Sequence, residues 1–198
     1  MKLRIGATLR GLRLTTTHSR WSKPWMTWVA TLATDESTRW VLDEHLLELE
    51  QLQARIELTE QRLEKKTADD PVVRRLREQP GIGPVTAWVI RAEVGRFDRF
   101  ARAKQLSRFC GLTPCNASSG SRRQADSGLV HAGNPMLKSI LIEAAHRLAR
   151  HERRWRTLYQ RLRAAGKPAC VALAAVANRW VRTLFHQMKT LEPATRQN

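Results

Sequence analysis

The chain has 198 residues, 42% of them hydrophobic, and its 35 Lys and Arg residues against 18 Asp and Glu give a net charge of +17. No apolar run reaches the about 18–20 residues of a membrane span, and three unevenly spaced cysteines exclude a disulfide framework. A basic excess of this size, most of it arginine, predicts a nucleic-acid partner and no membrane partner. We expect a cytoplasmic protein of the prokaryotic nucleoid with reduced thiols.

Residues 1–34 form an N-terminal segment whose structure the sequence leaves open. Trp21, Trp25 and Trp28 recur at the spacing of one helix face, with Pro24 in the first turn. We interpret these rings as packing residues in preference to a base-stacking surface.

Residues 35–70 are acidic, and their apolar positions fit a coiled-coil register of alternating steps of four and three. The register consists of Leu42, Leu46, Leu49, Ile56 and Leu63, with Gln53 and Glu60 at the remaining positions. This pattern predicts a coiled-coil connector, either one long helix or a helical hairpin. It pairs with another copy, giving a homo-oligomer through residues 42–63, or packs on its own chain.

Residues 71–190 begin with a short helix that ends near Gln79, a PGIG turn, and a second helix from Pro84. Pro71 and Pro84 suit first helical turns, and Asp69 and Asp70 favour a helix start. The arrangement is typical of a helix-hairpin-helix element, in which Gly81 and Gly83 would let a phosphate approach the backbone. A compact turn with no ligand is the alternative.

The rest of this region is helical in its pattern, apart from one loop rich in serine and glycine at residues 116–135. Asn134 and Pro135 are suited to be the N-cap and first residue of the next helix. An arginine-rich helix and a last helix at 169–190 follow, then a tail at 191–198. No strand of good length is evident, so we expect a mainly α fold.

Five motifs in order carry a family resemblance: QPGIGPVTAWVI, FDRFARAKQLSRFCGLTP, SSGSRR, HAGNPMLKSILIEAA and AAVANRWVRTLF. Over residues 72–190 the chain resembles the C-terminal domain of the Piv/MooV-type insertion-sequence transposases, the IS116/IS110/IS902 type, which are bridge-RNA-guided recombinases. The resemblance implies DNA recombination by a serine that becomes joined to a 5′-phosphate. It also implies DNA as partner and allows a structured guide RNA.

Carried onto this sequence, the nucleophile is Ser119, directly before Gly120, with Ser118 and Ser121 as alternatives. Nearby cations would stabilise the charge that develops on the phosphoryl oxygens, and the candidates are Arg122, Arg123 and Lys138. For the two arginines, general backbone binding is an equal alternative. We interpret His131 as a solvent-facing loop residue, and assign nucleic-acid binding to Gly81, Gly83, Arg147, Arg150, Arg153 and Arg154.

The family pairs this domain with an N-terminal RuvC-like domain whose four carboxylates bind metal, and residues 1–34 cannot supply it. We therefore expect no metal ligands or cofactor in this chain, with Mg²⁺ belonging to the RuvC-like domain. The sequence is interpreted as a truncated transposase that is inactive without a RuvC-like partner. The alternatives are an inert nucleic-acid-binding remnant and a coiled-coil oligomerisation module.

Overall fold

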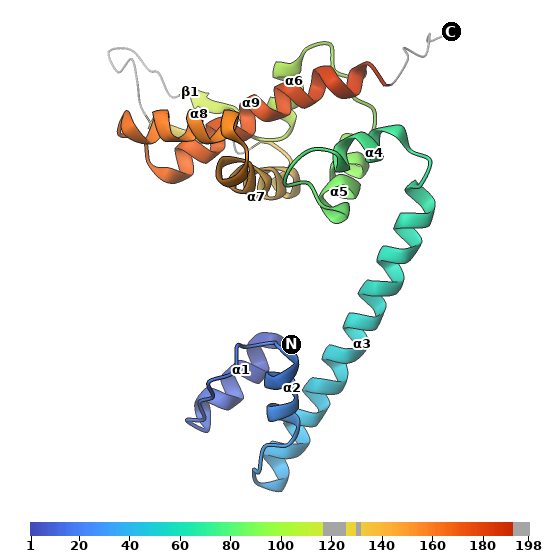
Figure 1. Cartoon of the computed structure of the whole chain (residues 1–198), viewed down its shortest axis with the longest axis vertical. Helices are drawn as coiled ribbons and strands as arrows, with labels where there is room; N and C mark the ends of the chain where they lie inside the picture. The colour runs from blue at the N-terminus through green and yellow to red at the C-terminus, as the bar shows by residue number, and fades with distance from the viewer. Residues whose placement is uncertain (117–125, 130–131, 192–198) are drawn as a thin grey trace. The chain divides into compact units, whose positions relative to one another are not determined.

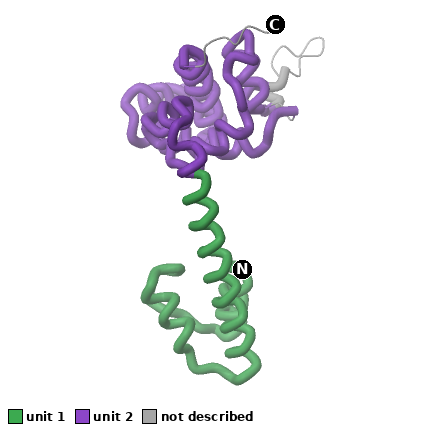
Figure 2. The backbone as a smooth tube through the Cα atoms, turned by 90° about the vertical axis from the view of Figure 1, so that its right-hand side faces the viewer, with its two compact units in different colours: residues 1–63 green, residues 64–198 purple. Residues whose placement is uncertain are grey.

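The computed structural model describes residues 1–116, 126–129 and 132–191. It confirms a mainly α fold, because helices account for most of the described residues and the strands are short. The chain divides into unit 1, residues 1–63, and unit 2, residues 64–198 (Figure 2). The division falls within the long helix of the connector and not at either end of it.

Unit 1 is built from α1 (Lys2–Gly11), α2 (Lys23–Ala30) and the first part of α3 (Glu36–Thr67). Each helix turns apolar side chains toward a small shared core, which consists of Ile5, Leu9, Trp25, Val29, Leu42 and Leu49. The sequence-based interpretation of the tryptophans is confirmed for Trp25, which is 2% exposed. Trp21 differs from expectation, because it precedes the N-cap Ser22 and has a φ of 69°.

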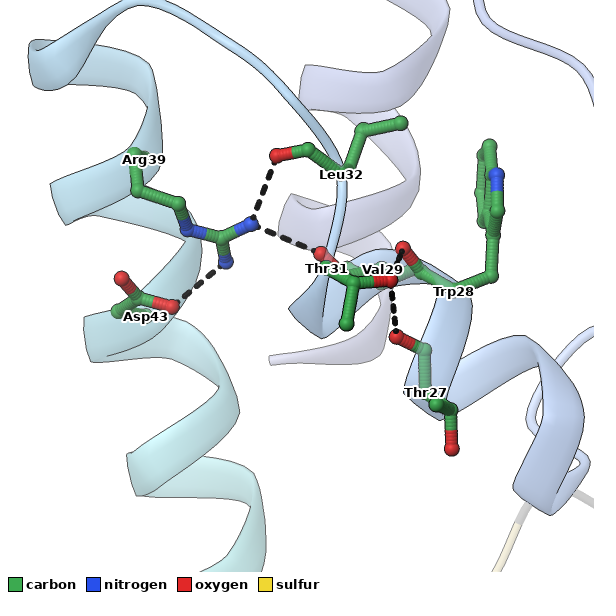
Figure 3. Close-up of polar contacts among 7 residues, drawn as sticks. All are labelled: Thr27, Trp28, Val29, Thr31, Leu32, Arg39 and Asp43. Carbon is green, nitrogen blue, oxygen red and sulfur yellow. Dashed lines mark hydrogen bonds and ion pairs between the residues drawn. The ribbon is translucent and has the colours of Figure 1, made fainter.

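The Arg39 side chain of α3 forms hydrogen bonds at the C-terminal end of α2 (Figure 3). Its Nη1 donates to the carbonyl oxygens of Val29 at 2.9 Å and Leu32 at 3.3 Å, while Nη2 forms an ion pair of 2.6 Å with Asp43. The last carbonyls of a helix have no partner within the helix, and a cation there also meets the negative end of the helix dipole. Arg39 therefore fixes the position of α2 in unit 1.

The connector is a single helix of 32 residues and not a helical hairpin. Leu42 and Leu49 are buried in the core of unit 1, so the first half of the predicted register packs on its own chain. Further along α3, Ile56 is 56% exposed. Pairing with another copy through residues 42–63 remains a prediction, and it concerns the second half of the register.

In unit 2, the end of α3 meets a pair of helices, α4 (Pro71–Arg77) and α5 (Pro84–Val94). The Trp88 indole Nε1 donates to Thr67 Oγ1 at 2.9 Å, and Arg77 pairs with Glu64 at 2.6 Å. Asp70 is the N-cap of α4, and Pro71 and Pro84 occupy first turns as the sequence predicts. The first helix of the pair ends two residues before Gln79, the predicted end.

The other elements of unit 2 complete its core (Figure 1). They are α6 (Ala103–Phe109), β1 (Pro114–Asn116), β2 (Asp126–Leu129), α7 (Pro135–His151), α8 (Arg153–Ala164) and α9 (Ala169–Lys189). Helix α7 packs against α5, α8 and α9, and α6 packs against α9. Fully buried side chains that fill the space between them include Phe97, Leu106, Leu112, Leu137, Leu141, Leu148, Trp180 and Leu184.

None of the helices in the described ranges is both long enough and apolar enough to cross a membrane.

Candidate nucleic-acid interface and serine segment

The segment that carries the candidate serine is bounded by two short strands. β1 pairs with β2 in antiparallel fashion, with Pro114 opposite Leu129 and Asn116 opposite Asp126. The predicted nucleophile and its neighbours lie between these strands and outside the described residues, namely Ser118, Ser119, Gly120, Ser121, Arg122 and Arg123. His131 follows the second strand and also lies outside the described residues. The roles of these residues therefore stay predictions. The structure does describe the two places where the chain enters and leaves the segment, which we call the base of the serine segment.

At this base, the backbones of Gly111 and Gly133 pass each other in close contact. A Cβ built on Gly133 would lie 2.2 Å from the Cα of Gly111, and the Gly111 backbone has a φ of +67°. The backbone N–H of Asn134 donates to the Phe109 carbonyl at 2.9 Å, which closes the same junction from α6 to α7. The chain thus leaves and returns at one point, and only glycine permits this contact.

The side chain of Asn134 forms two hydrogen bonds at the start of α7. Its Oδ1 accepts from the backbone N–H of Leu137 at 3.0 Å, which is the predicted N-cap, and its Nδ2 donates to Glu93 Oε2 at 2.5 Å. Lys138, a candidate phosphate contact, lies in the first turn of α7, with its Cε 3.0 Å from a Cβ built on Gly111. The aliphatic part of Lys138 is therefore beside the base of the serine segment.

Asn178 of α9 is a positioning residue that sequence reasoning missed. Its Nδ2 donates to Ser107 Oγ at 2.6 Å and to the Leu112 carbonyl at 2.9 Å. Ser107 is fully buried, so these bonds satisfy a polar group that would otherwise cost free energy. The only sequence signal was an asparagine in the apolar stretch AAVANRWV, flanked by buried Ala177.

A cysteine next to the glycine junction does not compete with serine as a nucleophile. Cys110 is buried, and burial raises the pKa of its thiol to about 12. A thiol with such a pKa is protonated at neutral pH, and the thiolate is the reactive form.

Gly81 and Gly83, the two glycines predicted to contact phosphate, have different surroundings. A Cβ on Gly81 would lie 3.1 Å from the Arg147 Cβ, and the Arg147 guanidinium donates to the Gly81 carbonyl at 3.1 Å. Gly81 therefore packs on α7, and its φ of +78° makes the turn possible. Gly83, the N-cap of α5, has open space where a Cβ would stand, so it is the one of the two with room for a ligand.

The arginines of α8 occupy the exposed part of an amphipathic helix. Arg154 and Arg161 are seven residues apart on one side, and Arg156 and Arg163 are seven apart on the other. Seven residues are nearly two turns, so each pair forms a row along the helix. Trp155, Leu158, Tyr159 and Leu162 lie on the side of the helix between the two rows and turn inward.

The predicted nucleic-acid contacts Arg147, Arg150, Arg153 and Arg154 are all exposed, as are Arg156, Arg161 and Arg163. Arg154 lies over the Trp155 ring at 4.7 Å, and Arg156 donates to the Arg150 carbonyl. These arginines lie at the end of α7 and along the exposed part of α8, on both sides of its buried stripe, and we call this set of residues the α8 arginine face. Such a face has the charge and the donors to bind phosphates.

The chain is similar to transposases of insertion sequences. It is 41% identical over 78 residues to the transposase for insertion sequence element IS1111A of Coxiella burnetii, covering 39% of this chain and 21% of that one. It is 30% identical over 146 residues to a probable family 20 transposase of Pseudomonas aeruginosa, covering 70% and 41%. An insertion element IS110 protein of Streptomyces coelicolor is 31% identical over 119 residues, covering 60% and 29%.

Residues 73–160 match the Transposase IS116/IS110/IS902 family. This match supports a transposase domain of this family over that part of the chain, and it confirms the resemblance seen in the five motifs. The matched region includes α5, both strands, α7 and the first part of α8. The chain spans between 21% and 41% of the lengths of these three relatives.

Proposed function

We propose that unit 2 is the serine-bearing domain of an enzyme that catalyses DNA transposition. The observation that carries the proposal is the glycine junction at the base of the serine segment, inside the region that matches the transposase family. The junction returns both ends of the segment to the start of α7, where Lys138 lies. The DNA would be that of the prokaryotic nucleoid, with a structured guide RNA as a further partner.

In the proposed step, the Ser119 oxygen attacks a DNA phosphorus and forms a phosphoserine bond to the 5′-phosphate. The bond between the phosphorus and the 3′-oxygen breaks, and this oxygen leaves with a proton. The serine proton passes to a base, and Arg122, Arg123 and Lys138 stabilise the charge on the phosphoryl oxygens. The phosphoserine bond keeps the energy needed to rejoin the strand.

Among the described residues, no group of three or more His, Cys, Asp or Glu side chains could hold a metal ion. The described side chains therefore do not form a site that fits Mg²⁺. We assign the proton acceptor to a RuvC-like partner domain. Without that partner, we expect the chain to bind nucleic acid and not to cleave it.

Replacing the nucleophile tests this proposal. The full chain is mixed with a RuvC-like domain of a relative and with labelled duplex DNA that carries the ends of an insertion sequence of this family. We expect a covalent protein–DNA band that survives detergent, and its loss in Ser119→Ala, because alanine has no oxygen to form the bond. Ser118→Ala and Ser121→Ala are the matched controls and should keep the band. Equal amounts of adduct from the parent and Ser119→Ala, or none from the parent, would contradict the proposal.

The α8 arginine face supports a second function, nucleic-acid binding without cleavage. If about five phosphates are neutralised, the logarithm of the binding constant should fall with the logarithm of salt concentration at a slope of about −4 to −5. Arg154→Gln with Arg161→Gln removes one row, so the slope should become less steep by about 2. The measurement is a salt series of DNA binding by fluorescence anisotropy.

The matched control for the arginine row is Arg55→Gln with Arg62→Gln on the exposed part of α3, which removes the same charge. This control should leave the slope close to that of the parent. If both double variants change the slope equally, binding follows net charge alone and the α8 arginine face has no special role.

A further inference from the structure

Unit 1 contains a pocket of about 180 Å³ that none of the proposed chemistry uses. It lies between α1, the segment that follows it and α2. The residues around it combine three tryptophans with cations and hydroxyls, and they include Arg10, Thr15, Thr16, His18, Arg20, Trp21, Trp25 and Trp28. This combination differs from an ordinary core cavity, which is apolar throughout.

The aromatic wall is a cluster of indole rings. The Trp21 and Trp25 ring centroids are 4.4 Å apart, and those of Trp25 and Trp28 are 6.4 Å apart. Trp25 is buried, whereas Trp21 and Trp28 are half-buried and pack against the core of unit 1. Lys2 Nζ lies 5.2 Å from the centroid of the Trp21 ring, so a ligand that stacks on Trp21 would use the ring surface that Lys2 leaves open or displace this side chain. Trp21 also has a φ of 69°, a conformation that bulky residues rarely adopt and that costs free energy.

The charge around the pocket has one sign. Residues 1–34 contain six Lys and Arg residues and no Asp or Glu. Arg10 and Arg20 are exposed at the pocket, and none of the ion pairs among the described residues involves either guanidinium group. An anion at the pocket would therefore find two guanidinium groups that no carboxylate neutralises.

The size of the pocket limits its ligand. Pockets for drug-sized ligands have about 300–1,000 Å³, whereas a single water needs about 10–15 Å³. A volume near 180 Å³ thus admits one ring system and not a dinucleotide cofactor. A planar ring stacks on indole, and a phosphate attached to it reaches the guanidinium groups.

We propose that unit 1 binds a nucleotide, with its base against Trp21 and Trp28 and its phosphate at Arg10 and Arg20. The site is separate from the serine chemistry of unit 2 and does not depend on it. The nucleotide is either free or part of a single-stranded nucleic acid, since both present the same base and phosphate. Because Arg39 fixes the end of α2, the wall that carries Trp25 and Trp28 is held in place before the ligand arrives.

The test uses the full chain labelled with ¹⁵N, and the probes are AMP, a short single strand of deoxyadenosine, and inorganic phosphate. The indole N–H signals are assigned with single tryptophan variants. We expect AMP and the single strand to shift the signals of Trp21 and Trp28, while Trp88 and Trp180 of unit 2 stay unchanged with AMP. Inorganic phosphate alone should leave all four signals in place.

Arg10→Gln with Arg20→Gln should weaken AMP binding at least about tenfold, because the variant loses two charge-assisted hydrogen bonds to the phosphate. Arg4→Gln with Lys23→Gln removes the same charge from exposed positions outside the pocket and should keep the affinity of the parent. The signal of Trp25, which is buried in the core of unit 1, reports before ligand is added that the variants stay folded.

Tighter binding of the strand than of AMP identifies single-stranded nucleic acid as the source, and the reverse order identifies a free nucleotide. The proposal is overturned if millimolar AMP and the strand leave the signals of Trp21 and Trp28 unchanged. It is also overturned if inorganic phosphate alone produces the same shifts, or if both double variants lose AMP binding equally. None of these results bears on Ser119.

Discussion

Gly133→Ala is expected to destabilise unit 2 by about 3 kcal/mol or more, the upper end of the range for overpacked sites. The new methyl group would lie 2.2 Å from the Gly111 Cα, 2.4 Å from the Gly111 nitrogen and 3.3 Å from the Cys110 carbonyl carbon. All three are backbone atoms, so no side chain can rotate away to make space. The junction must open, and α6 and α7 must separate at that point.

The expected loss converts to a thermal midpoint lower by about 6–12 °C, since 1 kcal/mol shifts a domain of 150–250 residues by about 2–4 °C. The measurement is unfolding followed by circular dichroism, together with the near-ultraviolet signal of the tryptophans. Gly166→Ala is the matched control, because Gly166 has a φ of +77° at the end of α8 but open space around a Cβ. It should cost only about 1–2 kcal/mol, the strain of the left-handed conformation.

A midpoint for Gly133→Ala no lower than that of Gly166→Ala would mean that the backbone at the junction adjusts at little cost. The two glycines would then have no special part in holding the serine segment. With the expected result, the same variant should also form less of the covalent adduct, because the ends of the segment would no longer be fixed against α7.

Local signals made much of this fold predictable. Asp70 and Asn134 each precede a proline, and an acceptor side chain followed by a residue with fixed φ starts a helix for reasons contained in a few residues. The buried positions of α7 follow from its 3.6-residue period. Such features depend on the neighbouring chain alone, so the sequence is sufficient to locate them.

The contacts that hold the serine segment are of another kind. Gly111 meets Gly133 across 22 positions, and Asn178 reaches Ser107 across 71. Neither pair has a spacing that distinguishes it, because the partners are chosen by how α6, α7 and α9 pack together. The sequence likewise did not predict the pocket of unit 1. The spacing of the tryptophans indicated a helix face, but it did not indicate that Arg10 and Arg20 lie beside these rings.

The long helix α3 shows a limit of sequence periodicity. The spacing of apolar residues identifies which face of a helix packs, but it does not identify the element on which that face packs. The first half of the apolar register on α3 is a packing surface as predicted, yet the register allowed either a second copy or the same chain as its partner. The answer at Leu42 and Leu49 is the same chain, because α1 and α2 supply a core for them. Only the folded arrangement of residues 1–34 could decide this.

Asp70→Ala is expected to cost unit 2 about 2–4 kcal/mol. Asp70 Oδ1 accepts from the backbone N–H groups of Val72 at 2.8 Å and Val73 at 3.2 Å, and Oδ2 accepts from Arg91 Nε at 2.7 Å. Losing an N-cap costs about 1 kcal/mol, and losing a hydrogen bond to a charged group costs about 1.5–3 kcal/mol. Asp69→Ala, the exposed neighbour, should change the midpoint little.

The same carboxylate gives this prediction a dependence on pH. Burial raises the pKa of Asp70, but the hydrogen bond from Arg91, the backbone N–H groups and the charge of Arg91 outweigh it, so the pKa is lowered from 3.8. A carboxylate with a lowered pKa stabilises the folded state fully above its unfolded pKa, and this stabilisation is lost as the pH falls through the folded value.

Urea unfolding of the parent and Asp70→Ala should therefore differ most at neutral pH and converge as the pH falls below 3.8. Asp69→Ala should follow the parent throughout. A difference between the parent and Asp70→Ala that stayed constant into the acid range would mean that packing, and not the charge of Asp70, joins α4 to α5. Convergence would instead show that the charge of Asp70, acting on Arg91 and on the backbone N–H groups at the start of α4, stabilises this part of unit 2.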